Sequence, residues 1–137
     1  MYVLDTNTLI YFFKGVGSVA YNLLRVPPRD IGIPSIVLYE LQTGIAKSNS
    51  PKKRLGQLNE MVSLVNILDF GEKEAVVSAK IRAGLEKKGT PIGPLDTLIA
   101  GTALAQQQGV LVTHNTKEFG RIKSLQVVDW YRSRETE

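Results

Sequence analysis

The chain contains no cysteine and has a single histidine, His114. The absence of cysteine excludes disulfide bonds and thiolate metal sites, and it fits a reducing compartment. A single histidine excludes a multi-histidine metal site within one chain and argues against a Ser–His or Cys–His nucleophilic site. The sequence therefore leaves little room for chemistry based on cysteine or histidine.

Long apolar runs are also absent. No stretch reaches the roughly 18 uncharged apolar residues that a membrane span requires, so we expect none. The first residues lack a basic segment and a small-residue cleavage site, and we expect a protein that is not secreted and is cytoplasmic. The 137 residues are 43% hydrophobic and 22% charged, which is typical of one globular domain. A net charge of +4 is compatible with a polyanionic partner, although many basic proteins bind no nucleic acid.

Short strands alternate with helices along the chain. This order predicts an α/β fold with a central parallel sheet of about five strands, covered by helices on both faces. We expect one domain over residues 1–137, of which the polar residues 131–137 form a frayed tail. The helix from residue 95 onward is apolar nearly all round, which indicates burial. Helices are predicted at 6–13, 18–25, 34–47, 51–64, 72–88 and 95–107, and strands at 2–5, 30–33, 65–68, 110–113 and 126–128.

Acidic and amide side chains recur where such a sheet presents its carboxyl edge. Asp5 follows the first strand, and Glu40 lies in the helix after the second. Asp96 is in the first turn of the apolar helix, whereas Asn115 and Glu118 follow the fourth strand. Carboxylates gathered at one edge repel each other, and Mg²⁺ or Mn²⁺, which prefer oxygen ligands, would offset that repulsion. Such ions can activate water and stabilise charge on a phosphodiester.

Each of these residues also has a purely structural alternative. Asp5 could cap the helix that follows it, and Asp96 could occupy a first-turn position that the helix dipole favours for acids. Glu40 borders an apolar face, where an unpaired carboxylate is costly, so its alternative is a salt bridge to a base such as Arg82. Asn115 could be a turn residue. Spacing alone leaves these choices open.

Five sequence blocks occur in order along almost the whole chain. They are LDTN at residues 4–7, SIVLYEL at 35–41, GTPIGPLD at 89–96, LVTHN at 111–115 and VDW at 128–130. Together they resemble the PIN-domain ribonucleases, and specifically the VapC toxins of bacterial toxin–antitoxin pairs. The resemblance implies a metal-dependent endoribonuclease with a parallel sheet and helices on both faces, which agrees with the fold predicted above.

The resemblance also implies roles for individual residues. Asp5, Glu40 and Asp96 match the three acidic positions of the family's metal site, where they would act as ligands of Mg²⁺ or Mn²⁺ and as catalytic residues. Thr6 and Asn7 match the polar pair after the first acid. Thr6 would hydrogen-bond to the site, and Asn7 would hold a neighbouring carboxylate.

Asn115 departs from the family pattern, because many PIN domains have a fourth acid near this position. The amide could orient a ligand or a water molecule, or Glu118 could supply the missing charge, so the number of metal ions stays open. Several cations could hold the RNA backbone, or they could simply form a solvated charged surface. The same two interpretations apply to the Lys52-Lys53-Arg54 cluster. The candidates are Arg82, Lys87, Lys88, Lys117 and Arg121.

The partners implied by the resemblance are structured RNA such as tRNA, a second copy of the chain and a VapB-like antitoxin that covers the site. Operator DNA would be bound only through the antitoxin complex. A haloacid-dehalogenase-like phosphatase is a poor alternative, because Asn7 replaces the second acid of its Asp-x-Asp motif. A receiver-type module needs a lysine after its last strand, and this chain has no lysine in a matching context after strand four. A catalytically weak PIN domain that only binds RNA or regulates is the alternative that stays open.

Overall fold

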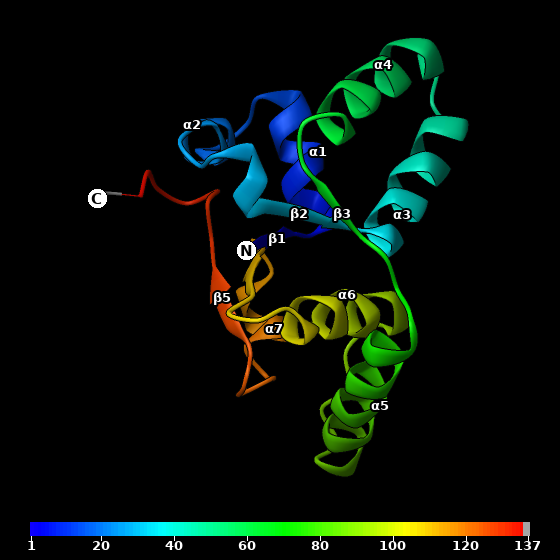
Figure 1. The fold of residues 1–137 in the computed structure, drawn as a ribbon, viewed down its shortest axis with the longest axis vertical. Helices are drawn as coiled ribbons and strands as arrows, with labels where there is room; N and C mark the ends of the chain where they lie inside the picture. Colours follow the sequence, from blue (N-terminus) through cyan, green and yellow to red (C-terminus); the bar gives the residue numbers. More distant parts are fainter. Residues whose placement is uncertain (136–137) are drawn as a thin grey trace.

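The computed structural model describes residues 1–135, and within them five parallel strands form one sheet in the order β3-β2-β1-β4-β5 (Figure 1). β1 lies in the middle, paired with β2 on one side and with β4 on the other. The predicted fold class is confirmed. The strands are β1 (Tyr2–Leu4), β2 (Ile31–Pro34), β3 (Asn66–Leu68), β4 (Val110–Val112) and β5 (Gln126–Val128).

Helices cover both faces of this sheet. α1 to α4 lie on one side, and α5 and α6 lie on the other (Figure 1). Every predicted helix is present, with ends that differ by at most a few residues. Two short elements, η1 and α7, were not predicted, because such short segments carry no readable periodicity. The helices are α1 (Thr6–Lys14), α2 (Val19–Leu24), η1 (Pro28–Asp30), α3 (Ser35–Ala46), α4 (Pro51–Val62), α5 (Glu72–Lys87), α6 (Pro94–Ala105) and α7 (Thr116–Phe119).

Glycines end two of these helices. Gly15 has a φ of 69° at the end of α1, and Gly89 has a φ of 71° just beyond α5. This left-handed conformation is cheap for glycine and strained for other residues, so the two positions stop the helices where the sequence predicts. None of the helices within residues 1–135 is long and apolar enough to cross a membrane.

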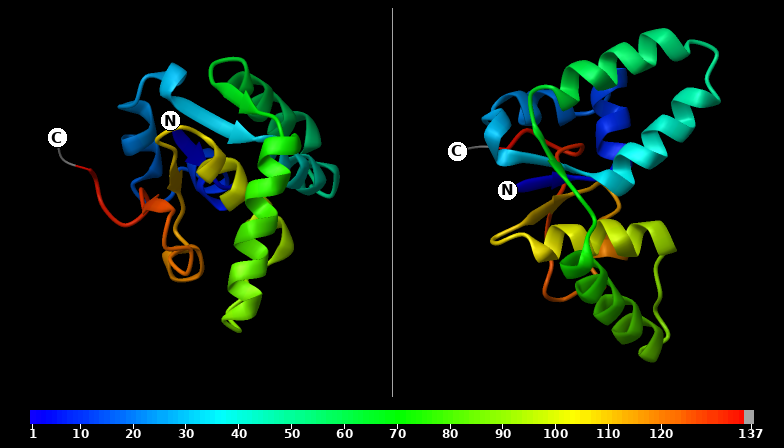
Figure 2. Two further views of the ribbon diagram at one scale, coloured as in Figure 1. Left: turned by 60° about the horizontal axis from the view of Figure 1, so that its bottom comes forward. Right: turned by 45° about the vertical axis from the view of Figure 1, so that its right-hand side comes forward.

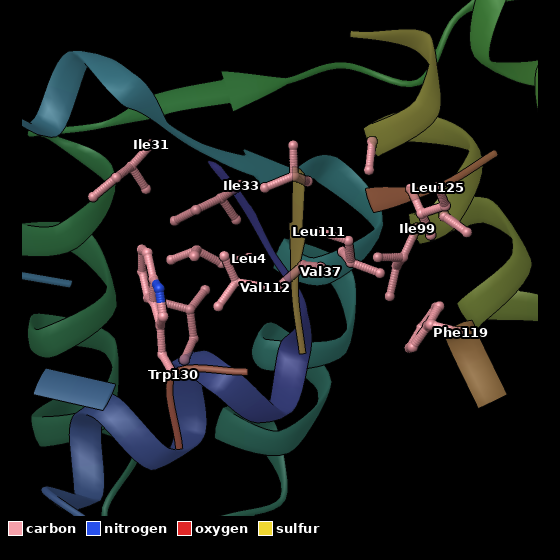
Figure 3. Packing of buried hydrophobic residues seen from close by; sticks show 14 of the residues in the cluster. Leu4, Ile31, Ile33, Val37, Ile99, Leu111, Val112, Phe119, Leu125 and Trp130 are labelled. Atoms are coloured by element: carbon pink, nitrogen blue, oxygen red, sulfur yellow. The ribbon is translucent and has the colours of Figure 1, made fainter. Parts of the chain in front are cut away.

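The core joins the strands to α3 on one face and α6 on the other. Leu4, Ile33 and Leu111 of the sheet are fully buried, and they pack with Val37 of α3 and Ile99 of α6 (Figure 3). α6 is buried on nearly every side, as predicted, because it lies between the sheet and α5. Burying an aliphatic side chain of this size contributes about 1.5–3 kcal/mol, so these contacts hold the helix starts firmly against the sheet.

The strand order places a topological switch between β1 and β4. The chain runs outward from β1 to β2 and β3, and it then crosses back to β4 on the other side of β1. In open parallel sheets, ligands bind at such a switch point, beyond the carboxyl ends of the strands. The strands run toward the beginnings of α3 and α6, which contact each other there (Figure 2, right).

The C-terminal segment is docked on α2 as far as residue 135. Asn22, which is 2% exposed, donates hydrogen bonds from its Nδ2 atom to the carbonyl oxygens of Trp130 (3.0 Å) and Ser133 (2.9 Å). Its Oδ1 atom accepts from the backbone N–H of Glu135 at 2.7 Å. These bonds attach part of the segment 131–135 to α2, and the expectation of a frayed tail stays a prediction. Residues 136–137 lie outside the described residues.

Candidate metal centre

Asp5 lies at the switch point, directly after β1, and is 5% exposed. Its backbone N–H donates to the carbonyl oxygen of Val112 (3.2 Å), and its Oδ1 atom accepts from the N–H of Thr8 (2.9 Å). Burial raises the pKa of Asp5, while hydrogen bonds from Thr113 and Thr8 oppose the rise. Asp5 therefore caps α1 as the structural alternative predicted, and it also places a buried carboxylate at the sheet edge.

Glu40 reaches the same edge from α3. The hydroxyl group of Thr6 donates to its Oε1 atom at 2.7 Å, across 34 residues of sequence. The salt bridge to Arg82 that was considered for Glu40 is wrong, since Arg82 pairs with Glu86 at 3.0 Å. Within residues 1–135, no cation forms an ion pair with Glu40. The Thr6 hydroxyl group stabilises this carboxylate by a hydrogen bond but does not neutralise its charge.

Asp96 completes the acidic cluster from the first turn of α6. The helix starts with Gly93 at the N-cap and Pro94 at the first position, which places the carboxyl group near the positive end of the helix dipole. Burial raises the pKa of Asp96 from 3.8 to about 6, with further contributions from three neighbouring negative charges. These charges belong to Glu40, Asp5 and Glu118.

Glu118, and not Asn115, adds the fourth charge. Glu118 lies on α7, and its charge contributes to the raised pKa of Asp96. The backbone N–H of Asn115 donates to the Thr113 hydroxyl group (3.0 Å), but among the described residues the Asn115 side chain makes no hydrogen bond. Asn7 is exposed, and within residues 1–135 its side chain makes no hydrogen bond to a carboxylate. The fold therefore gathers Asp5, Glu40, Asp96 and Glu118 into one electrostatic cluster, with Thr6 as a supporting donor.

Thr113 was not predicted as a site residue from the sequence. Its side chain hydrogen-bonds to Asp5, and its hydroxyl group accepts from the N–H of Asn115. The signal was available in the strand register: Leu4 pairs with Val112, so the residues that follow, Asp5 and Thr113, are neighbours at the carboxyl edge. Recognising it required knowing that β1 and β4 are adjacent.

The donor set fits a hard divalent cation. Among residues 1–135, no group of three or more Asp, Glu or His side chains is arranged so that it could hold a metal ion by itself. Mg²⁺ does not require one, because it keeps several waters and is usually bound by one or two carboxylates together with substrate phosphates. The cluster has only oxygen donors, and it carries mutual repulsion that raises the pKa of Asp96. A divalent cation would relieve this repulsion.

The predicted RNA-binding cations do not form one group. Arg82 is paired with Glu86, whereas Lys87 and Lys117 are exposed on α5 and α7. Lys88 and Arg121 line one hollow of the surface, and Arg121 donates from Nη1 to the carbonyl oxygen of Pro91 at 2.9 Å. Two further cations line that hollow and were not predicted from the sequence as RNA-binding residues. They are Lys80 and Lys123.

Comparison with known proteins agrees with this geometry. A family model for the PIN domain matches residues 2–125. The tRNA(fMet)-specific endonuclease VapC of Salmonella typhimurium is 36% identical over 129 residues, covering 94% of this chain and 97% of that protein. Ribonuclease VapC2 of Rickettsia felis is 39% identical over 132 residues, covering 95% and 98%.

Solved structures show the same fold. VapBC2 from Rickettsia felis, bound to a DNA fragment of its promoter, matches with a TM-score of 0.86 at 39% identity and covers 94% of this chain and 98% of its own. DNA-bound VapBC from Salmonella typhimurium matches with a TM-score of 0.87 at 37% identity, covering 94% and 97%. The chain therefore belongs to the PIN-domain family and, within it, to the VapC toxins of VapBC toxin–antitoxin systems.

Proposed function

We propose that this protein is a metal-dependent endoribonuclease that acts as the toxin of a toxin–antitoxin pair in the bacterial cytoplasm. It would hydrolyse phosphodiester bonds in structured RNA such as tRNA, with residues 1–137 acting as a single PIN domain. The observation that carries the proposal is the cluster of carboxylates at the switch point of the sheet, where burial first, and the charges of Glu40, Asp5 and Glu118 in addition, raise the pKa of Asp96 to about 6. The ribonuclease relatives, one of them named as specific for tRNA(fMet), support the substrate class.

In this proposal, Asp5 and Asp96 hold Mg²⁺ or Mn²⁺, and Glu40 contributes directly or through water. When bound, the ion supplies positive charge at the scissile phosphate and lowers the pKa of a water molecule. Thr6 holds one oxygen of Glu40 at 2.7 Å and thereby orients the other, which takes the proton from the attacking water. Glu118, which follows Asp96 in the sequence, adds a negative charge to the cluster and takes the part of the fourth acid.

The test is cleavage of a tRNA transcript by purified protein in Mg²⁺ or Mn²⁺, with mapping of the new 5′ ends. Asp5→Asn and Asp96→Asn should lower the rate by at least about 10²-fold, because each removes a charge that holds the ion. Asp30→Asn is the matched control, since Asp30 is an exposed acid of η1 outside the cluster. New ends that persist in both cluster variants would rule out the mechanism.

We also propose a VapB-like antitoxin and a second copy of the chain as partners, with operator DNA bound only through the antitoxin complex. Structures of relatives are toxin–antitoxin complexes, and three of them are bound to DNA. An apolar hollow of about 420 Å³ between α1, α2 and α4 supports a protein partner. Its lining includes Phe12, Phe13 and Leu24, and Leu24 is 73% exposed. An apolar segment of the antitoxin would bury these side chains.

The second candidate function is a catalytically weak PIN domain that binds RNA or regulates. The absence, within residues 1–135, of a group of three acidic or histidine side chains that could hold a metal ion favours it. This alternative predicts that Asp5→Ala leaves both RNA binding and the effect on growth unchanged. The ribonuclease proposal predicts instead that growth arrest is lost while RNA binding remains.

A further inference from the structure

A second hollow, of about 520 Å³, lies on the side of the molecule formed by α5 and the segment that follows α7. In Figure 1 these two parts lie next to each other below α6. Its floor is apolar and consists of Val77, Ile81 and Leu85 of α5 with Leu104 and Ile122. The α5 positions are four residues apart and share one helix face. The floor is thus the outer surface of the core.

The rim of this hollow is cationic. Lys80 and Lys88 extend from α5, and Arg121 and Lys123 extend from the segment after α7. No acidic side chain lines the hollow in the part of the chain that the structure describes. Across residues 1–135, Lys80, Lys88 and Lys123 form no ion pair, whereas Arg82 of the same helix α5 pairs with Glu86. We call these four cations and their apolar floor the basic hollow.

We propose that the basic hollow binds the RNA substrate at a distance from the scissile bond, an inference that rests on the proposed ribonuclease function. Four unneutralised cations around one depression attract a polyanion, and their contacts to phosphates would position the strand without reading its sequence. The apolar floor suits the ribose and base of a nucleotide better than it suits a simple inorganic anion. The ligand class is therefore a polynucleotide strand.

The position of the basic hollow relative to the carboxylates fits this role. Leu104 of the floor and Asp96 of the acidic cluster lie eight residues apart on α6, which is about 12 Å along the helix axis. The hydrogen bond from Arg121 to Pro91 (2.9 Å) also ties the rim to the segment that leads into Asp96. One RNA strand can therefore contact both places.

Charge removal is the first test. The triple variant Lys80→Gln, Lys88→Gln, Lys123→Gln is built in the inactive Asp96→Asn protein, and binding of a fluorescently labelled tRNA transcript is measured across a salt series. Removing three phosphate contacts should lower the slope of log K against log salt by about 2 and weaken binding at least tenfold. The matched control is the triple glutamine variant of Lys14, Lys47 and Lys73, three exposed lysines that do not line the hollow. It should keep the affinity within about twofold.

Space filling is the second test, and it leaves the charge unchanged. A Cβ atom at Gly84, which also lines the hollow, would meet no other atom within 4 Å, so Gly84→Leu is compatible with the fold. In a protein whose melting temperature is not lowered, this variant should weaken tRNA binding several-fold. It should leave the cleavage rate of a dinucleotide substrate as in wild type, because such a substrate cannot reach the hollow.

The outcomes separate this inference from the proposed function. If wild type cleaves no RNA but the hollow variants still lose tRNA binding, the ribonuclease proposal fails and the RNA site stands. If wild type cleaves tRNA and the hollow variants match the control variant in affinity and salt slope, the basic hollow is not an RNA site. A larger loss in the control variant than in the hollow variants would overturn the inference as well.

Discussion

Replacing Asp96 with asparagine should stabilise the metal-free protein while it abolishes cleavage. Burial and three neighbouring charges raise the pKa of Asp96 from 3.8 to about 6, so the ionised form disfavours the folded state. A shift of two units corresponds to about 3 kcal/mol. Because Asp96 is only partly buried, solvent screening reduces this to about 1 kcal/mol. For a chain of 137 residues, the expected gain in melting temperature is about 3 °C.

The pH dependence of this gain follows from the sign of the shift. An acid whose pKa is higher in the folded than in the unfolded state penalises folding only when it is ionised. The penalty from Asp96 therefore grows as the pH rises from near 3.8 and is complete above about 6. The difference between wild type and Asp96→Asn should be absent near pH 3.5 and full at pH 7.5.

The assay is thermal denaturation at several pH values, in chelator and again with Mg²⁺. In Mg²⁺ the order should reverse, because an ion that binds only the folded state stabilises wild type in proportion to its affinity. Asp30→Asn controls for the loss of one negative charge and should show neither effect. A variant that melts at or below wild type in chelator at pH 7.5 would refute the reasoning, as would a gain that persists at pH 3.5.

Four further predictions concern the candidate metal site and the apolar hollow. Asp5→Asn should keep the cap on the N–H of Thr8, whereas Asp5→Ala should cost about 1 kcal/mol more in denaturant unfolding, and both should lose activity. Thr6→Val should lower kcat with little change in KM, because it frees Glu40 to rotate. Glu40→Gln should lower kcat by about 10²–10⁴-fold, and equal rates in these variants and wild type would exclude Glu40 as the base. Leu24→Asp should weaken inhibition by a VapB-like antitoxin without changing RNA cleavage, as measured by titration of the toxin with the antitoxin.

Several features of this protein were determined by the sequence itself. Periodicity, glycines and prolines placed all the longer helices and the strands, because these signals act over one or two turns of chain. The cap of α1 by Asp5 is a contact between residues three apart, and it was predictable for the same reason. The resemblance of five ordered blocks then identified the family before any contact was known.

Other features were decided only by the tertiary structure. The bond between Thr6 and Glu40 spans 34 residues, and the effect of the Glu118 charge on Asp96 depends on where the fold places the short helix α7. The tail is held by the distant Asn22, and the basic hollow joins cations of α5 to others more than thirty residues further on. Such contacts leave no local pattern in the chain, because their partners meet only after the sheet and its helices have packed.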